Sequence, residues 1–180
     1  TFLNNGYRIN GGSTAWDLNQ NNQDYCAWSF RKAPKFFDVL TWTGDGSAGP
    51  FTLSHNLGSS VGMSVVKLTS HAGPFLVNHR SVPTKYLSLN TTASAQTDVT
   101  MTSTDSTITF NGSNVYYNFS GRTYVAYLFA HNDGDGEFGP DGDADIIKCG
   151  SYTADGSGNA ASTSVIVIYS YYWVIYTKIK

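Results

Sequence analysis

Charged residues are scarce in this sequence. Asp, Glu, Lys and Arg make up 13% of its 180 residues, about half of their usual 25% share in globular proteins. The 11 Lys and Arg residues are scattered along the chain, and the formal net charge is −2. Domains that bind nucleic acid usually gather basic residues on one face. The composition therefore excludes nucleic acid as an expected partner.

Cysteine is also rare, with Cys26 and Cys149 far apart in sequence. A chain of this length buries roughly 70% of its unfolded surface, so its core does not need a disulfide for support. Both cysteines fall in apolar strand-like patterns, and a free cysteine behaves as a small hydrophobic residue. We predict two buried free thiols, with a disulfide between them as the alternative.

Long hydrophobic runs and helical periodicity are missing. The most apolar stretch, 165–175, contains tyrosines and is shorter than a membrane span; it predicts two strands. We find no signal or transit sequence and expect no membrane insertion. No stretch of eleven or more residues spaces its apolar residues as an amphipathic helix would.

Aromatic and turn-forming residues are abundant instead. Aromatics make up 14% of the chain, which has 12 tyrosines and 18 glycines, a composition typical of strands joined by tight turns. Short apolar runs recur between turn residues at spacings of about 8 to 12 residues, as in sandwiches and barrels. The sequence predicts an all-β fold, an antiparallel β-sandwich of jelly-roll-like form. Its expected strands are 2–10, 25–30, 36–42, 51–57, 63–69, 75–79, 85–89, 99–102, 107–110, 115–118, 123–130, 145–153, 165–169 and 173–178.

An internal repeat runs through these strands. YVAYLF at 124–129 matches YCAWSF at 25–30, and SYTADGS at 151–157 matches TWTGDGS at 41–47 in the same order. The period is about 100 to 110 residues, the size of a domain and too long for a solenoid repeat. We therefore expect 42–151 to form one sandwich unit. Residues 1–41 would supply strands of a preceding unit or the first strands of the sandwich, and 152–180 strands of a following unit or its last strands.

The strand expected at 123–130 is apolar on both faces. Tyr124, Ala126 and Leu128 share one face, and the residues between them, Val125, Tyr127 and Phe129, share the other. A strand of this kind is usually central and covered on both sides. We expect its two faces to meet a second sheet and a neighbouring subunit.

Several strings of this chain, in this order, resemble a family of virion proteins of tailed phages. They are WSFRKAPKFFDV at 28–39, SHNLG at 54–58, NHRS at 78–81, YLSLN at 86–90 and YVAYLFAH at 124–131. Many members come from phages of cyanobacteria and are labelled tail-fibre or structural proteins. The resemblance covers roughly 25–157. It departs at the end, where Tyr171, Tyr172 and Trp173 stand in place of the usual Pro-x-Trp pattern.

The resemblance implies a non-enzymatic virion component. Its partners would be copies of itself, other virion proteins and host surface glycan. A β-sandwich module of a tail fibre is the first interpretation, and a capsid decoration protein or a carbohydrate-binding adhesin domain are the alternatives. Such a protein is assembled in the host cytoplasm and is extracellular after release.

The acidic stretch 133–145 is the strongest candidate for a metal site. Its carboxylates alternate with glycines, and Ca²⁺ takes six to eight oxygen ligands on a flexible backbone. The spacing does not match an EF-hand, so the alternatives are a structural calcium site and a solvated acidic turn. No other cofactor is expected. The candidate ligands are Asp133, Asp135, Glu137, Asp141 and Asp143.

Aromatic residues in or beside expected loops are candidates for stacking on sugar rings or for a subunit interface. These residues are Trp16, Tyr116, Tyr117 and Tyr171.

Catalytic residues are not predicted. The four histidines, His55, His71, His79 and His131, lack metal-ligand spacing, and no nucleophile-elbow motif is present. Glu137 is the only glutamate, so a glycoside hydrolase would depend on pairs of aspartates. A hydrolase stays the least favoured hypothesis.

Overall fold

The structure is a computed structural model that describes residues 2–3, 6–9, 20–112, 114–151 and 167–168. The chain divides into two compact units, Thr1–Phe30 and Arg31–Lys180. In Thr1–Phe30, β1 (Phe2–Leu3) pairs with β2 (Gly6–Tyr7) in an antiparallel hairpin. No other strand is present among the described residues of this unit.

Residues 25–30 differ from the prediction. They lie outside any strand, and the side chains of Cys26 and Trp28 are exposed. The matching residues 124–129 lie inside a strand, so the two copies of the repeated string have different local structures here. The prediction of a buried Cys26 is wrong, because the segment that carries it packs into no sheet of the described chain.

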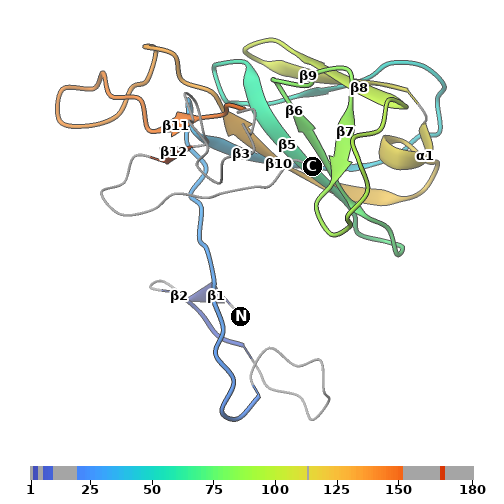
Figure 1. Cartoon of the computed structure of the whole chain (residues 1–180), viewed down its shortest axis with the longest axis horizontal. Coiled ribbons are helices and arrows are strands. Elements are labelled where there is room, and N and C mark those ends of the chain that lie inside the picture. Colours follow the sequence, from blue (N-terminus) through green and yellow to red (C-terminus); the bar gives the residue numbers. More distant parts are fainter. Residues whose placement is uncertain (1, 4–5, 10–19, 113, 152–166, 169–180) are drawn as a thin grey trace, which may run out of the picture. The chain divides into compact units, whose positions relative to one another are not determined.

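The second unit is built on a five-stranded antiparallel sheet with the order β3-β10-β5-β6-β7 (Figure 1). Strands β5, β6 and β7 follow one another as hairpins, whereas β10 inserts late in the sequence between β3 and β5. The strands are β3 (Phe37–Thr43), β5 (Val61–Leu68), β6 (Phe75–His79), β7 (Tyr86–Ser88) and β10 (Thr123–Ala130).

A three-stranded antiparallel sheet, with the order β4-β9-β8, forms the second layer. Its strands are β4 (Phe51–Ser54), β8 (Val99–Ser103) and β9 (Thr107–Gly112). The chain crosses between the layers after β3, β4, β7 and β9. The two layers enclose one hydrophobic core, which confirms the predicted antiparallel β-sandwich.

Strict alternation along the strands creates this core. Tyr124, Ala126 and Leu128 of β10 are at most 1% exposed, and they face Ile108 and Phe110 of the smaller sheet within one cluster. Because side chains point to opposite faces at successive strand positions, the same alternation turns Val125, Tyr127 and Phe129 to the outer face. The prediction that one face of this strand meets a second sheet is confirmed, and the neighbouring subunit expected over the other face stays a prediction.

A short helix, α1 (Asn114–Tyr117), stands where a strand at 115–118 was expected. Beyond it, Asn118 donates from Nδ2 to Asp45 Oδ1 over 2.7 Å and accepts the Asp45 backbone N–H at Oδ1 over 3.0 Å. Trp42 Nε1 donates to the carbonyl of Tyr117 over 2.8 Å. These bonds tie the loop after β3 to the segment that enters β10.

The predicted strand at 145–153 is reduced to β11 (Ile147–Lys148), which pairs with β12 (Val167–Ile168). β3 runs across the domain boundary expected after residue 41 and belongs to the sandwich. In the described part of the chain, no helix has the length and apolar character needed to cross a membrane.

Candidate functional site

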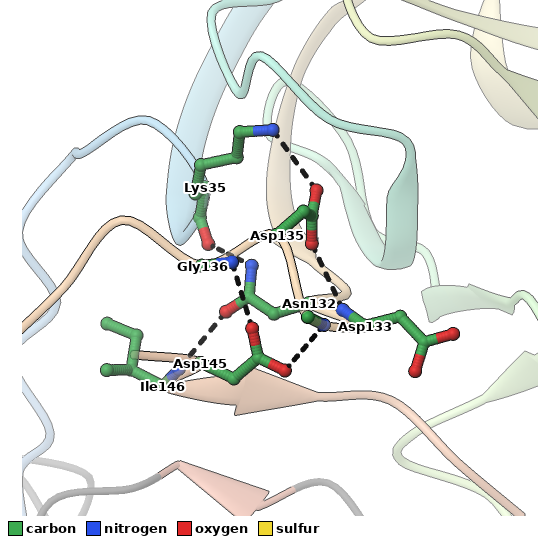
Figure 2. Close-up of polar contacts among 8 residues, drawn as sticks. Lys35, Asn132, Asp133, Asp135, Gly136, Asp145 and Ile146 are labelled. Carbon is green, nitrogen blue, oxygen red and sulfur yellow. Dashed lines mark hydrogen bonds and ion pairs between the residues drawn. The ribbon is translucent and has the colours of Figure 1, made fainter. Parts of the chain in front are cut away.

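The acidic loop between β10 and β11 is organised by the buried side chain of Asn132 (Figure 2). Its Nδ2 donates to the carbonyl of Lys35 over 2.9 Å, and its Oδ1 accepts the backbone N–H groups of Ile146 and Ile147 over 3.1 and 3.2 Å. Asn132 thereby joins both ends of the loop to the turn before β3. An amide fits this position because it supplies a donor and an acceptor at once.

The carboxylates nearest Asn132 already have partners. Asp145 accepts the N–H groups of Gly134 and Gly136, each over 2.9 Å, and Asp135 accepts the N–H of Asp133 over 3.0 Å (Figure 2). Asp135 also pairs with Lys35 over 3.1 Å, and Asp133 with Lys148 over 2.9 Å. The loop thus satisfies much of its own negative charge.

These partners shift the pKa values of the charged side chains in and beside the loop. The backbone N–H of Asp133, followed by the ammonium group of Lys35, holds the pKa of Asp135 below its ordinary value despite some desolvation. Lys148 likewise lowers the pKa of Asp133. In the opposite direction, the hydrogen bond to Asp135 raises the pKa of Lys35. All three groups are therefore charged near neutral pH.

The five carboxylates predicted as calcium ligands are not gathered around one point. Asp133 and Asp135 face two different lysines, and Glu137, Asp141 and Asp143 are exposed. Among the residues with described positions, no three His, Cys, Asp or Glu side chains are grouped so that they could hold a metal ion. The geometry favours the solvated acidic turn over the calcium-site alternative.

The aromatic candidates separate into three environments. Tyr117 is 2% exposed; its ring stacks on Phe110 at 4.3 Å and its hydroxyl donates to Asn78 Oδ1 over 2.8 Å. The prediction that Tyr117 offers a surface for sugars or subunits is therefore wrong, because α1 turns it into the core. Tyr116 is half-buried against Tyr86, with ring centroids 5.5 Å apart. Trp16 and Tyr171 lie outside the described residues.

Burial explains the tyrosine chemistry. Desolvation, with the hydrogen bond to Tyr116 in second place, raises the pKa of Tyr86 to about 12. Desolvation also raises the pKa of Tyr117. Neither hydroxyl is poised to lose a proton near neutral pH, so both serve packing and hydrogen bonding.

Cys149 is a buried free thiol, as predicted. Its Sγ donates to the carbonyl of Ala130 over 3.4 Å, and its backbone N–H donates to His131 Nδ1 over 3.0 Å. A methyl group on Gly62 would lie 2.7 Å from this sulfur, so glycine permits the close approach of β5. Burial raises the pKa of Cys149 to about 12, which leaves the thiol protonated and unreactive.

Three of the four histidines share one arrangement. Nδ1 of His55 accepts the N–H of Leu57, and Nδ1 of His79 accepts the N–H of Ser81, as His131 does with Cys149. An Nδ1 that accepts a hydrogen bond carries no proton, so each ring is held in its neutral form. Desolvation lowers the pKa of all three imidazoles, and Arg80 adds to the effect at His79 and His131.

Sequence reasoning missed a buried carboxylate at the start of β3. Asp38 is 1% exposed, pairs with Lys32 over 2.6 Å and accepts the N–H groups of Val39 and Asn56. Burial pushes the pKa of Asp38 upward, but Lys32 and the two N–H groups outweigh it and the pKa falls. The sequence alone could have singled out Asp38, because it follows Phe37 within a strand pattern and aspartate is rare inside strands.

The two outer faces of the sandwich have opposite character. The outer face of the three-stranded sheet carries hydroxyl and amide side chains, among them Thr52, Ser54, Thr100, Thr102, Thr107, Thr109 and Asn111. The middle of the outer face of the five-stranded sheet is apolar, whereas Thr41, Thr43 and Lys67 lie on the same face toward one end. We call it the outer apolar face and define it by Val39, Met63, Val65, Val77, Leu87, Val125, Tyr127 and Phe129.

The pairing register builds a continuous apolar row across this sheet. Tyr127 of β10 stands opposite Val39 on one side and Val65 on the other. The row continues through Val77, which is only 7% exposed, to Leu87. Tyr127 is 38% exposed at its centre. A contiguous apolar patch on a protein surface usually marks a site of contact with a partner.

Comparison with known proteins identifies a family for this chain, but it finds no individual protein that matches. Neither the curated proteins nor the solved structures contain a match to this sequence. A family model matches residues 1–178, nearly the whole chain. The protein with this sandwich and these two unlike outer faces belongs to the family described as Domain of unknown function (DUF7483).

Proposed function

We propose that this protein is a non-enzymatic structural component of a phage particle, a β-sandwich module of a tail fibre or similar appendage that assembles with copies of itself. The resemblance of 25–157 to virion proteins supports a place in the phage particle. The outer apolar face supports association with copies of the same chain. The module would act in the virion, after assembly in the host cytoplasm.

The outer apolar face is the single observation on which the proposed self-association rests. An antiparallel sheet can leave one face to solvent, and that face is then polar. The three-stranded sheet follows this rule with its threonines, such as Thr52 and Thr109, whose hydroxyls lie 2.8 Å apart. The five-stranded sheet does not follow it, since Tyr127, Val39 and Val65 occupy the middle of its outer face. A second copy would remove this surface from water.

The size of the face sets the strength of the contact. Five strands spaced about 4.8 Å apart and three rows of side chains along them give a footprint of roughly 400 Å² per copy. Specific interfaces usually bury about 800 Å² per partner. We therefore expect the face alone to give a weak, concentration-dependent association, with further contacts needed in a stable assembly.

The buried polar side chains support a structural role. Asp38, Asn78, Asn118 and Asn132 are at most 1% exposed, and each is bonded to backbone or to another side chain of the sandwich. Side chains used in this way fix loops to strands. They are not positioned to act on a substrate from a cleft.

Two experiments test the proposal. Sedimentation velocity of the purified chain should show a sedimentation coefficient that rises with protein concentration, and a compact monomer at all concentrations would overturn the assembly. Antibody labelling of phage particles that carry this chain, viewed by electron microscopy, should mark the tail or its fibres. Label on the capsid would support the decoration alternative, and unlabelled particles would overturn the virion role.

A further inference from the structure

The two sandwich sheets end in β3, β7, β4 and β8, and three of these edge strands are covered, wholly or in part, by other segments of the chain. At the edge of β7, Tyr86 exchanges two backbone hydrogen bonds with Gln96, each over 2.9 Å. At the edge of β8, the N–H of Met101 donates to the carbonyl of Pro83 over 3.1 Å. Covering an edge in this way prevents it from pairing with another chain.

The edge of β3 is covered over its first half. Phe37 exchanges two backbone hydrogen bonds with Ala33, and Lys32 Nζ donates to the carbonyl of Val39 over 3.1 Å. The N–H of Val39 donates to Asp38 Oδ1 over 2.8 Å. A lysine side chain along an edge also opposes the approach of a further strand.

The edge of β4 lacks such cover in the part of the chain that the structure describes. The N–H of His55 donates to the carbonyl of Ser106 over 2.8 Å, which fixes the phase of the ladder between β4 and β9. Because hydrogen-bonded pairs alternate along an antiparallel ladder, Leu53 bonds to β9, and Thr52 and Ser54 turn their N–H and C=O groups to the other side. Both residues are exposed, and no described residue bonds to these backbone groups.

The core is incompletely covered along the same side of the sandwich. Four side chains that pack against the buried core cluster from the edge strands stay partly exposed, namely Leu40, Trp42, Phe51 and Leu53. In the middle of the smaller sheet, Ile108 of β9 is fully buried. A strand added beside β4 would remove more of Leu53 from water.

We propose that β4 of one copy pairs antiparallel with β4 of a second copy, with Leu53 on the two-fold axis. The inference rests on the self-assembly proposed above and names a second contact for it, on a different surface. Adding a strand to an open sheet edge is a common mode of recognition. The pairing would join two three-stranded sheets into one continuous sheet with the order β8-β9-β4-β4-β9-β8.

The ends of the open edge fix this register. With Leu53 on the axis, Thr52 of each copy lies opposite Ser54 of the other, and each such pair exchanges two backbone hydrogen bonds. An axis at Thr52 would place Ser54 opposite Pro50, which has no N–H. An axis at Ser54 would place Thr52 opposite Asn56, whose N–H already donates to Asp38 Oδ2 over 2.9 Å.

The edge is therefore complementary to itself, which favours a second copy as the partner. Its residues, Phe51 to Ser54, carry no charge that would repel an identical strand. Two hydrogen-bonded pairs make a small contact, so we expect it to be weaker than the contact through the outer apolar face.

Single cysteines in β4 test the register by disulfide trapping, in the full chain with Cys26→Ser to remove its exposed thiol. The two copies of residue 53 would have Cα atoms about 4.5 Å apart, which suits a disulfide. Thr52→Cys and Ser54→Cys are the matched controls, because each would lie about 7 to 8 Å from its own copy. Leu53→Cys should give several-fold more covalent dimer under oxidised glutathione, although Leu53 is less exposed than either control residue.

A second test removes one donor of the pairing. Thr52→Pro deletes an N–H that takes no part in the ladder to β9, and edge strands tolerate proline at such positions. Thr52→Ala is its control, because it also loses the hydroxyl contact with Thr109 but keeps the N–H. In the Leu53→Cys chain, Thr52→Pro should lower the yield of covalent dimer several-fold, and Thr52→Ala should leave it unchanged.

The outcomes separate this inference from the proposed function. Preferential trapping at 53 that Thr52→Pro reduces supports the pairing. If the chain associates in sedimentation but traps equally at the three positions, traps best at 52 or 54, or is unaffected by Thr52→Pro, the pairing is wrong and the self-assembly stands. If the chain stays monomeric at every concentration and forms no covalent dimer, both are wrong.

Discussion

At the scale of single residues, the protein holds its polar groups in fixed roles. Tyr117 shows this most clearly, because its ring fills the core against Phe110 while its hydroxyl bonds to buried Asn78. A buried acceptor that loses its donor costs about 1 to 3 kcal/mol. The stability of the sandwich therefore depends on the hydroxyl as well as on the ring.

We expect Tyr117→Phe to lower the free energy of unfolding by about 1 to 2 kcal/mol, because Asn78 Oδ1 is left buried without this donor. Urea denaturation measures the change. Tyr127→Phe is the control, since its hydroxyl lies on the half-exposed outer face. Equal effects of the two substitutions would contradict the role assigned to Tyr117.

The histidines make a second prediction, on pH. His55, His79 and His131 have pKa values lowered from the ordinary 6.5 in the folded chain. The unfolded state therefore binds protons first as the pH falls, and stability that is complete above about pH 6.5 is lost below it. The lowered aspartate pKa values, as at Asp38, act only below their ordinary value of 3.8.

We expect the free energy of unfolding, measured in urea, to be constant from about pH 8 to 7 and to fall as the pH drops below about 6.5. Replacing His79, whose Nδ1 accepts the Ser81 N–H, with Gln should reduce the slope. A profile that stays flat below pH 6.5 would show that the histidines titrate alike in the folded and unfolded chain.

At the scale of elements, alternation was the reliable signal. The alternation correctly predicted that Tyr124, Ala126 and Leu128 of β10 face the core, and a neighbouring subunit over the other face stays a prediction. The four-residue helix α1 could not be predicted, because one turn has no periodicity to detect. Tyr117 was consequently placed on the surface when it lies in the core. Residues 25–30 carry the β10 pattern without forming a strand, since a strand needs a neighbour that no sequence pattern supplies.

The acidic loop is the element whose chemistry was hardest to predict. Glycines and carboxylates in alternation suggest a cation site, but the positions of Lys35, Lys148 and Asn132 are set by distant parts of the chain. Lys35 lies 100 positions before Asp135. Pairing over this distance depends on tertiary structure, so the local sequence could not show that the negative charge was already balanced.

We expect the thermal midpoint of the protein to be the same in millimolar calcium and in excess EDTA, because Asp133, Asp135 and Asp145 already accept hydrogen bonds within the loop. Differential scanning calorimetry checks this. A midpoint that rises with calcium, and no longer rises in Asp141→Asn with Asp143→Asn, would restore the calcium-site alternative.

At the scale of the whole molecule, the two sheets face unlike surroundings. The threonine-rich face suits water, whereas the outer apolar face around Tyr127 suits a second copy. A face contact between identical surfaces closes a dimer.

Sedimentation velocity of the full chain and two matched variants tests this account most directly. Tyr127→Asp places a charge at the centre of the outer apolar face, and Thr102→Asp places one on the polar face of β8. The unaltered chain and Thr102→Asp should sediment faster as concentration rises, while Tyr127→Asp should shift this rise to at least tenfold higher concentration, a loss of about 1.4 kcal/mol in association. A chain that stays monomeric, or that associates equally with either charge, would contradict the account.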